Sequence, residues 1–206
     1  MTKYDVNTDE DLFQPGSDGN VLLNFLNITD KEEMEETETG LLYKLYEKVF
    51  TSDELPSGAF TFADIIEWHR LWLGNVYSWA GKIRSVSMSK AGFSFMAPLQ
   101  IQRHIDTFET SYLVPFNEMA VTDIDKEEFI SLVAESHVEF ILIHPFREGN
   151  GRISRLLIDY MSHEAGYGLL DYSLWDTHKD FYFRSIQAGL NGDYEHMKRL
   201  VRDIII

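Results

Sequence analysis

The sequence predicts an all-α protein that carries one short β-hairpin. Most of the chain places apolar residues three and four positions apart, which is the spacing of a helix with one buried face. Polar residues that cap helix N-termini precede several of these stretches. One segment, from Arg84 to Met96, alternates instead with a period of two, which is the pattern of paired strands.

An irregular arm followed by a long helix is expected at the N-terminal side. Residues 1–20 carry proline and glycine among polar residues, which favours irregular structure, and we expect one domain over residues 21–206. The run Thr29-Asp30-Lys31-Glu32 resembles a capping box and predicts a helix that ends near Phe50. Its acidic first turns suit the positive end of the helix dipole as a solvated face, with docking of a partner as the alternative.

Further helices follow from the same spacing. Thr61 is expected to cap a helix that ends near Leu73, with an apolar core stripe that includes His69 and Trp72. We interpret His69 as a hydrogen-bonded core residue rather than a metal ligand. The other predicted helices cover 99–112, 126–143, the apolar run from Ile153 to a cap at Gly166, 177–188 and 193–202.

The segment from Arg84 to Met96 is the predicted strand pair. Its apolar positions alternate on both sides of Lys90-Ala91-Gly92, and Pro98 ends the run. Two strands alone are marginally stable in water, so we expect this hairpin to pack on the helices. Its free edge suits an extended peptide, although a purely structural hairpin explains the pattern equally well.

The composition restricts the classes of function. The chain has 206 residues, of which 44% are apolar, enough for one domain with a substantial core. Eighteen basic against 34 acidic residues give a net charge of −16, which opposes general binding to nucleic acid or to anionic membranes. The chain has no cysteine, so disulfides and thiolate metal sites are excluded. With no signal-like or membrane-length apolar run, we expect a cytoplasmic protein.

The stretch from His144 to Arg155 gathers the residue types of a phosphate site. Pro145 disfavours helical geometry at the preceding residue, so the incoming helix should end near His144 with its imidazole pointing inward. Gly149-Asn150-Gly151 then lets the backbone turn tightly just where the next helix begins. The free amides and positive dipole of a helix N-terminus bind anions.

Two arginines follow these glycines at the start of an apolar helix. Arg152 and Arg155 lie three residues apart on one helix face, so both guanidinium groups can reach the same anion. Arginine on a buried helix is costly unless it is paired, and a nucleotide phosphate would pair both. Asp159 or Glu164 could pair them instead, as a structural alternative.

Several other site chemistries are excluded by spacing. His163-Glu164-Ala165-Gly166 lacks the second histidine of a zincin, and the chain contains neither a phosphate-binding loop of the Walker type nor a nucleophile elbow. His137 is interpreted as a core residue or as a support of the neighbouring site residues, rather than as a catalytic residue. Glu148 suits magnesium, which binds one or two carboxylates together with phosphate oxygens and water.

His144 to Arg155 resembles the motif of the Fic family, His-x-Phe-x-(Asp/Glu)-Gly-Asn-Gly-Arg-x-x-Arg, at every position. Residues 77–84 are similar to the family's segment that leads into its flap hairpin, and residues 27–30 to its usual opening. The resemblance covers roughly residues 20–200. It implies a Fic fold, a helical bundle around a central pair of motif helices with a hairpin flap, and transfer of AMP from ATP to a Ser, Thr or Tyr hydroxyl of another protein.

The resemblance also implies a role for each motif residue. His144 would be the general base for the target hydroxyl, and its ordinary pKa near 6.5 would leave it neutral at pH 7. Phe146 would anchor the loop, and Glu148 would hold Mg²⁺ on the α- and β-phosphates. Gly149, Asn150 and Gly151 would bind the phosphates, with the Asn150 amide on the α-phosphate and with Arg152 and Arg155 on the β- and γ-phosphates. The flap would dock the target through Val86, Met88, Lys90, Phe93 and Phe95.

The resemblance leaves open how the protein is regulated and which group it transfers. Many Fic proteins are inhibited by a glutamate in a Ser/Thr-x-x-x-Glu-Gly/Asn motif, which neither end of this chain contains. We therefore expect a separate antitoxin-like inhibitor, or none; an internal glutamate on Arg155 would argue against both. The alternatives to AMP transfer are transfer of UMP, phosphocholine or a γ-phosphoryl group, and a nucleotide-binding regulator that has lost catalysis.

Overall fold

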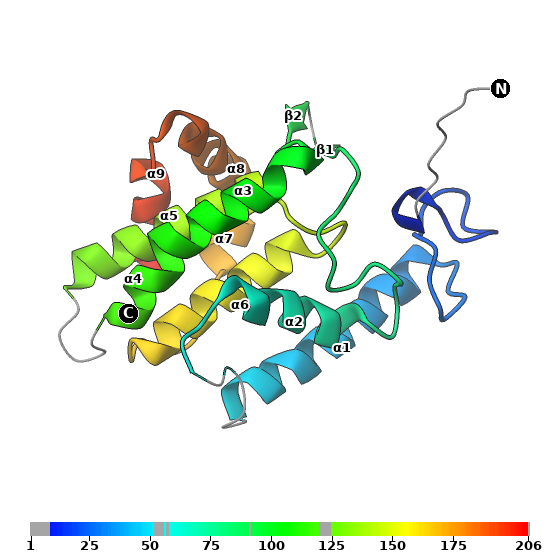
Figure 1. Cartoon of the computed structure of the whole chain (residues 1–206), viewed down its shortest axis with the longest axis horizontal. Helices are drawn as coiled ribbons and strands as arrows, with labels where there is room; N and C mark the ends of the chain where they lie inside the picture. Colours follow the sequence, from blue (N-terminus) through cyan, green and yellow to red (C-terminus); the bar gives the residue numbers. More distant parts are fainter. Residues whose placement is uncertain (1–8, 52–55, 57, 91, 120–124, 206) are drawn as a thin grey trace.

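Two helices, α5 (Lys126–Ile143) and α6 (Asn150–Glu164), pack against each other, and the other elements surround this pair (Figure 1). The computed structural model describes residues 9–51, 56, 58–90, 92–119 and 125–205. The remaining elements, in chain order, are η1 (Asp9–Asp11), α1 (Lys31–Thr51), α2 (Phe62–Leu73), β1 (Ser89–Lys90), β2 (Phe93–Ser94), α3 (Pro98–Phe108), the π-helical turn η2 (Glu109–Leu113), α4 (Val114–Glu118), α7 (Ser173–Thr177), α8 (Lys179–Ala188), η3 (Gly189–Asn191) and α9 (Glu195–Ile204).

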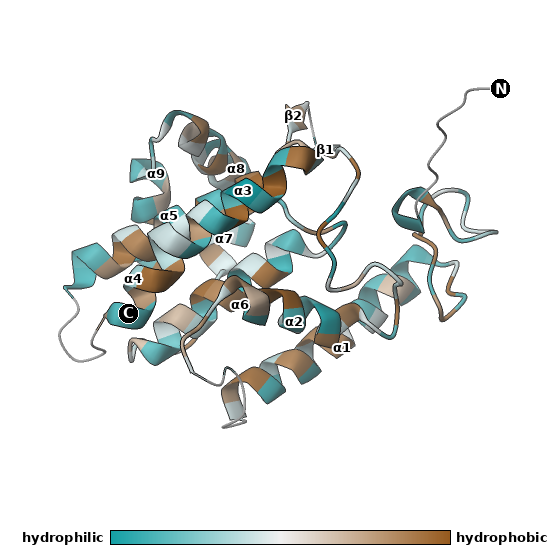
Figure 2. Ribbon diagram, viewed as in Figure 1, coloured by the Kyte–Doolittle hydropathy of each residue, from teal (hydrophilic) through white to brown (hydrophobic). Residues whose placement is uncertain are grey.

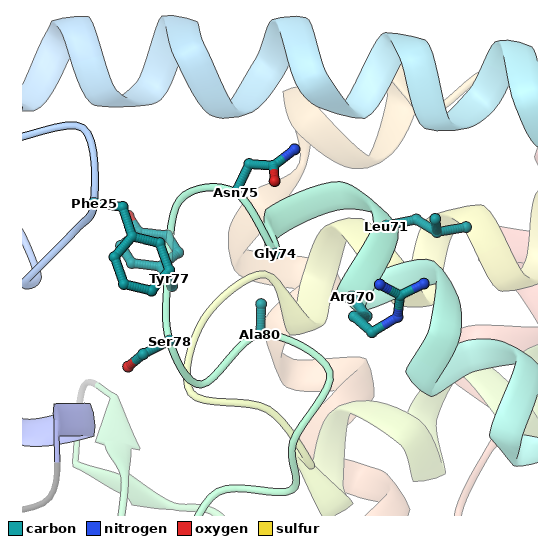
Figure 3. Close-up of a pocket in the computed structure, with 8 residues that line it drawn as sticks. All are labelled: Phe25, Arg70, Leu71, Gly74, Asn75, Tyr77, Ser78 and Ala80. Carbon is teal, nitrogen blue, oxygen red and sulfur yellow. The ribbon is translucent and has the colours of Figure 1, made fainter.

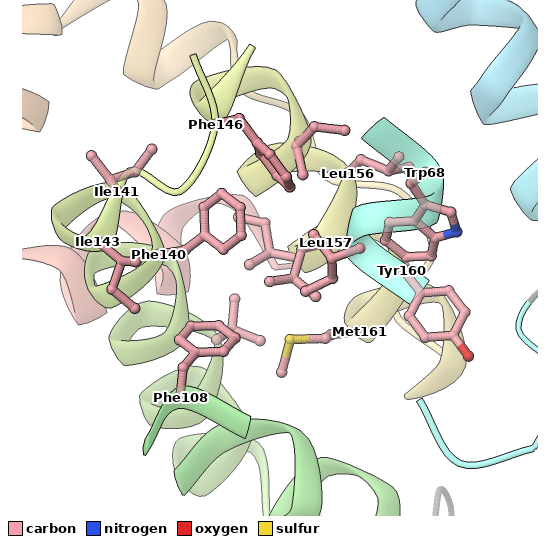
Figure 4. Packing of buried hydrophobic residues seen from close by; sticks show 14 of the residues in the cluster. Trp68, Phe108, Phe140, Ile141, Ile143, Phe146, Leu156, Leu157, Tyr160 and Met161 are labelled. Carbon is pink, nitrogen blue, oxygen red and sulfur yellow. The ribbon is translucent and has the colours of Figure 1, made fainter. Parts of the chain in front are cut away.

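The core lies where α2, α3, α5 and α6 face one another. Aromatic and aliphatic side chains from all four helices interdigitate there, and Phe146 reaches in from the loop between α5 and α6 (Figure 4). The ribbon coloured by hydropathy shows apolar residues on the inner helix faces and polar residues outside (Figure 2). Fully burying a side chain such as Phe146 contributes about 1.5–3 kcal/mol, so its burial anchors the motif loop in this core.

The predicted all-helical class and most predicted helices are confirmed. The helices expected over 126–143 and from Thr61 to Leu73 have those limits, and Thr61 forms a capping box with Asp64. In α1 the cap is Asp30, whose Oδ1 accepts the Glu33 N–H at 2.9 Å. Beyond α6 the prediction was incomplete, because the short helix α7 precedes α8 and its residues carry no helical periodicity of their own.

The hairpin is confirmed but is shorter than the alternating pattern indicated. Its strands pair antiparallel, with Lys90 opposite Phe93. One further backbone bond, from the Phe95 N–H to the Met88 carbonyl at 3.0 Å, extends the pairing beyond the strands. The turn at Ala91 lies outside the described residues.

The N-terminal arm is packed on the domain from Asp9 onward, where it forms the short turn η1 and an isolated β-bridge between Phe13 and Leu22; residues 1–8 lie outside the described part of the chain. The Glu10 carboxylate accepts hydrogen bonds from the Ser85 N–H and hydroxyl, both at 2.9 Å. The Glu10 carbonyl accepts one from Arg147 Nε at 2.7 Å. The arm therefore braces the base of the hairpin and the motif loop. Our division between arm and domain at residue 20 stays a prediction.

Among the described residues, no helix is both long enough and apolar enough to cross a lipid bilayer.

Two buried histidines connect the core helices. His137 of α5 is fully buried, with Nδ1 at 2.6 Å from the Ser154 hydroxyl and Nε2 at 2.8 Å from the Tyr182 hydroxyl. His69 of α2 accepts the Gly81 N–H at Nδ1 (2.8 Å), so its Nε2 carries the proton and donates to the Glu148 carbonyl (3.1 Å). Both are the hydrogen-bonded core residues that the sequence indicated. Burial lowers the pKa of His137 to about 3 and that of His69 to about 4.

These shifts predict that acid destabilises the fold. In the unfolded chain each imidazole takes up a proton near its ordinary pKa of about 6.5, whereas in the folded protein it does so only near pH 3–4. The stabilisation is complete above about pH 6.5 and decreases as the pH falls, by about 1.4 kcal/mol per pH unit for each histidine. Urea unfolding between about pH 7 and about pH 5 should show this loss, and His137→Gln should have a flatter dependence than the unchanged protein. Equal slopes would contradict the assignment.

Candidate active site

His144 sits at the point where α5 ends. It adopts the left-handed conformation (φ 51°, ψ 59°), and its N–H still donates to the Phe140 carbonyl at 2.9 Å. Its Nδ1 lies 3.2 Å from the Ile141 carbonyl. A carbonyl can only accept, so Nδ1 carries the proton and Nε2 presents a lone pair. The local turn thus fixes the tautomer that a general base requires.

The flap covers the His144 imidazole. The Phe95 ring stacks on it at 3.6 Å between centroids, with 13° between the ring planes. Burial, with smaller contributions from the nearby Arg84 and Lys90 charges, lowers the pKa of His144 to about 4. The sequence-based expectation of an ordinary pKa was therefore wrong, because it could not include the flap. The conclusion that His144 is neutral at pH 7 is confirmed.

Phe146 and Asn150 close the loop between the two central helices. Phe146 is fully buried and stacks on His69 at 3.9 Å, which fits the predicted anchor. Its N–H donates to Asn150 Oδ1 at 2.8 Å, and its carbonyl accepts from Asn150 Nδ2 at 2.7 Å. The Asn150 side chain is thereby occupied in holding the loop. Its phosphate contact stays a prediction, to which the backbone amide can contribute.

The N-terminus of α6 keeps its amides available. Within the described residues, the backbone N–H groups of 150–152 have no hydrogen-bond partner. Gly149 precedes them with φ 80°, and a Cβ at this position would lie 2.4 Å from the Trp72 ring. Only glycine fits this turn, so the close approach of Trp72 and the left-handed backbone together explain Gly149, whereas a Cβ at Gly151 would meet no atom within 4 Å.

The two arginines have separate partners. Arg152 donates from Nη2 to Glu38 at 2.6 Å, and its guanidinium lies 4.5 Å from the centre of the Trp72 ring. Arg155 donates from Nη2 to Asp176 of α7 at 2.7 Å and lies over the Tyr172 ring at 4.7 Å. The predicted alternative pairing was wrong, because Asp159 accepts from Tyr46 and Tyr172 instead and Glu164 lies beside His163.

Glu148 is the carboxylate available to a metal. Its Oε1 accepts the Gly149 N–H at 2.8 Å and lies 3.5 Å from Arg152 Nη2, and the side chain is 45% exposed. No group of three or more His, Asp or Glu side chains in the described part of the chain could hold a metal by itself. One accessible carboxylate beside an open helix N-terminus fits magnesium, which takes its other ligands from phosphate and water.

The base of the flap is fixed by Arg84, which is buried. Arg84 donates from Nε to the His144 carbonyl at 2.6 Å and from Nη1 and Nη2 to the Val86 and Met96 carbonyls at 2.5 and 2.6 Å. A cation also suits the carbonyl-rich C-terminus of α5. Beyond this base, Val86, Met88, Phe93 and Phe95 are partly exposed, and Lys90 lies over the Phe183 ring at 5.5 Å.

A cavity of about 360 Å³ lies outside this site. It is bounded by the end of α2, by the following loop and by Phe25 of the N-terminal segment, and Arg70, Tyr77 and Ala80 are among its lining residues (Figure 3). None of its lining residues belongs to 144–155.

Sequence reasoning missed the residues that surround the motif. Glu38 is hidden within an acidic run that we interpreted as solvated, although its position among the apolar residues of that helix was a usable signal. Trp72 was assigned only to the core stripe. Asp176 lies in a helix that was not predicted.

Comparison with known proteins agrees with this geometry. A family model described as Fic/DOC family matches residues 59–162. A Sinorhizobium fredii protein named "Probable protein adenylyltransferase y4lH" is 32% identical over 169 residues, which is 82% of this chain and 83% of that protein. "Protein adenylyltransferase VbhT" of Bartonella schoenbuchensis is 34% identical over 71% of this chain, and the match spans only 30% of that longer protein.

Solved structures have the same fold. The Fic domain of a VirB-translocated effector of Bartonella quintana, solved with bound ADP, superposes with a TM-score of 0.74 at 25% identity and covers 94% of each chain. A Fic domain of a Bartonella sp. AR 15-3 effector superposes with a TM-score of 0.77 at 22% identity, covering 94% of this chain and 90% of that one. The histidine at the helix end, the open N-terminus of the next helix, the matching family model and these relatives lead to one conclusion: the chain belongs to the Fic/DOC family.

Proposed function

We propose that this chain is a protein adenylyltransferase that moves AMP from ATP to a Ser, Thr or Tyr hydroxyl of a target protein. The observation that carries the proposal is the placement of a neutral histidine, with its Nε2 lone pair free, at one helix end and of an open helix N-terminus just after it. The names of the relatives support the same activity. The bound ADP of the Bartonella quintana domain supports a nucleotide site in this fold.

His144 starts the reaction as general base. Its Nε2 accepts the proton of the target hydroxyl while the hydroxyl oxygen forms a bond to the α-phosphorus of ATP. The bond between the α-phosphorus and the bridging oxygen breaks, and pyrophosphate leaves with that electron pair. The Nδ1–H of His144 keeps its bond to the Ile141 carbonyl, which stabilises the imidazolium that forms.

The phosphate chain lies along the N-terminus of α6. The backbone amides of residues 150–152 and the positive end of the helix dipole bind the oxygens on which negative charge accumulates. Arg152 and Arg155 bind the β- and γ-phosphates and favour departure of pyrophosphate. Phe146 and Asn150 keep these groups in place through the loop that they close.

Glu148 would hold the magnesium ion that accompanies ATP. Its accessible carboxylate next to the helix N-terminus would supply one ligand. Magnesium bound there would neutralise part of the charge on the α- and β-phosphates.

The flap docks the target by strand addition. Its short strands leave a free edge beside Phe95, and Phe95 lies on the imidazole of His144. A target segment that pairs with this edge would bring its hydroxyl next to the base. Val86, Met88, Lys90 and Phe93 supply the partly exposed surface for its side chains.

We also propose that a separate inhibitor protein regulates this chain. Arg155 is paired with an aspartate, Asp176, which is 52% exposed, and no glutamate among the described residues bonds to it. A separate antitoxin-like protein could supply an inhibitory glutamate to Arg155, and co-purification of one stable partner would support this proposal.

We also propose a cytoplasmic location, since a chain without cysteine is compatible with a reducing compartment.

The test of the function uses ATP labelled at either the α- or the γ-phosphate, with Mg²⁺ and cell lysate. We expect label that depends on the added protein only from α-labelled ATP, and we expect His144→Ala to abolish this transfer while ATP binding is retained. His163→Ala, which changes an exposed histidine at the far end of α6, is the matched control and should transfer normally. Label from γ-labelled ATP that is lost with His144→Ala would indicate phosphoryl transfer instead, and unchanged transfer by His144→Ala would refute the assigned base.

The pKa of His144 gives a second prediction. In the nucleotide-free protein an NMR titration should find its imidazole neutral down to about pH 5, because burial lowers its pKa to about 4. Phe95→Ala removes the stacked ring and exposes the imidazole, so the pKa should rise toward about 6.5. A pKa near 6.5 in the unchanged protein would show that the flap does not cover His144 in solution.

A further inference from the structure

A buried carboxylate of α1 reaches the phosphate end of the site. Glu38 is only 5% exposed, and both of its oxygens are engaged. Oε1 accepts the Tyr77 hydroxyl at 2.6 Å, and Oε2 accepts Arg152 Nη2 at 2.6 Å. The two ends of the ion pair lie 114 residues apart in the chain, so α1 is joined directly to the motif.

The Trp72 ring packs against the guanidinium group of the same arginine. Its indole N–H donates to the Glu38 carbonyl at 2.8 Å, which fixes the ring against α1. The ring face carries the Arg152 guanidinium at 4.5 Å, and the ring edge contacts Gly149. The negative face of an indole ring attracts a cation placed over it. Arg152 is therefore held from one side by a carboxylate and from below by an aromatic ring.

This arrangement leaves part of the guanidinium available. Within the described residues, only Nη2 of Arg152 has hydrogen-bond partners, Glu38 and the more distant Glu148, so Nε and Nη1 can still donate to an anion. The side chain is 32% exposed, whereas that of Glu38 is 6% exposed. The pair thus presents its cationic member toward solvent and hides its anionic member in the protein.

Glu38 is poorly suited to compete with a phosphate for Arg152. Moving away would leave a buried carboxylate and the Tyr77 hydroxyl without their charged network, which is costly. The pair between Arg155 and Asp176 differs, because Asp176 is half-exposed and can be solvated when it releases its arginine. The charge and the burial of Glu38 therefore indicate that it stays bound to Arg152 when a phosphate binds.

We propose that Glu38 is a positioning residue that, with Tyr77 and Trp72, holds the Arg152 guanidinium in the orientation that binds the ATP phosphates. The inference rests on the proposed function. A free arginine side chain loses rotamer entropy when it is immobilised, and an arginine already fixed avoids that loss when ATP binds. In this proposal α1 contributes to ATP binding through Glu38, in addition to packing on the core.

The test measures ATP binding and transfer in Glu38→Gln. The variant keeps the size of the side chain but loses the charge that holds Arg152, so we expect ATP binding to weaken by about tenfold and the KM for ATP to rise in proportion, with the KM for the target unchanged. Tyr77→Phe removes one support of the carboxylate and should have a smaller effect in the same direction. Glu36→Gln changes an exposed glutamate of the same helix and should bind ATP normally.

A double-mutant cycle separates positioning from general damage to the fold. In an Arg152→Ala background, Glu38→Gln should weaken ATP binding no further, because the arginine that it orients is gone. Equal losses in both backgrounds would overturn the proposal, as would unchanged or tighter ATP binding by Glu38→Gln alone. Failure of the unchanged protein to bind ATP would instead overturn the proposed function, and this inference with it.

Discussion

The loop between α5 and α6 depends on one reciprocal pair of hydrogen bonds, between the Phe146 backbone and the Asn150 side chain. This pair joins the end of one helix to the start of the next, so that the lone pair of His144 and the open amides of α6 belong to one rigid unit. Phe146 secures the unit by its burial and by its stacking on His69, whose Nε2 in turn donates to the Glu148 carbonyl. A base and an anion site held this way need little reorganisation during reaction.

Electrostatics in this acidic protein are arranged locally. Each motif arginine is paired with a carboxylate from an element outside the motif, Glu38 of α1 or Asp176 of α7. The two pairs differ in burial, and burial determines how readily each carboxylate can give way to a phosphate. The net charge of −16 therefore says little about the site, where the guanidinium groups and a helix N-terminus face the expected anion.

The flap contacts His144 in two ways. Arg84 joins the carbonyls at the base of the hairpin to the carbonyl of His144, while Phe95, which lies between β2 and Met96, covers the imidazole. A hairpin this short has little stability of its own, so these attachments determine its position. A target that pairs with the flap edge would thereby approach a base whose place and protonation state are already set.

The sequence by itself determined the all-α class, most helix limits and the identity of the motif residues, because helical periodicity, capping and the Gly-Asn-Gly pattern are local properties. His69 and His137 were assigned to the core for the same reason. Tertiary structure decided what no local pattern contains. The partners of Arg152 and Arg155 come from helices outside the motif, and the lowered pKa of His144 comes from its burial, to which the Phe95 ring of the flap contributes. Long-range contacts of this kind depend on how the helices pack, which a single sequence does not specify.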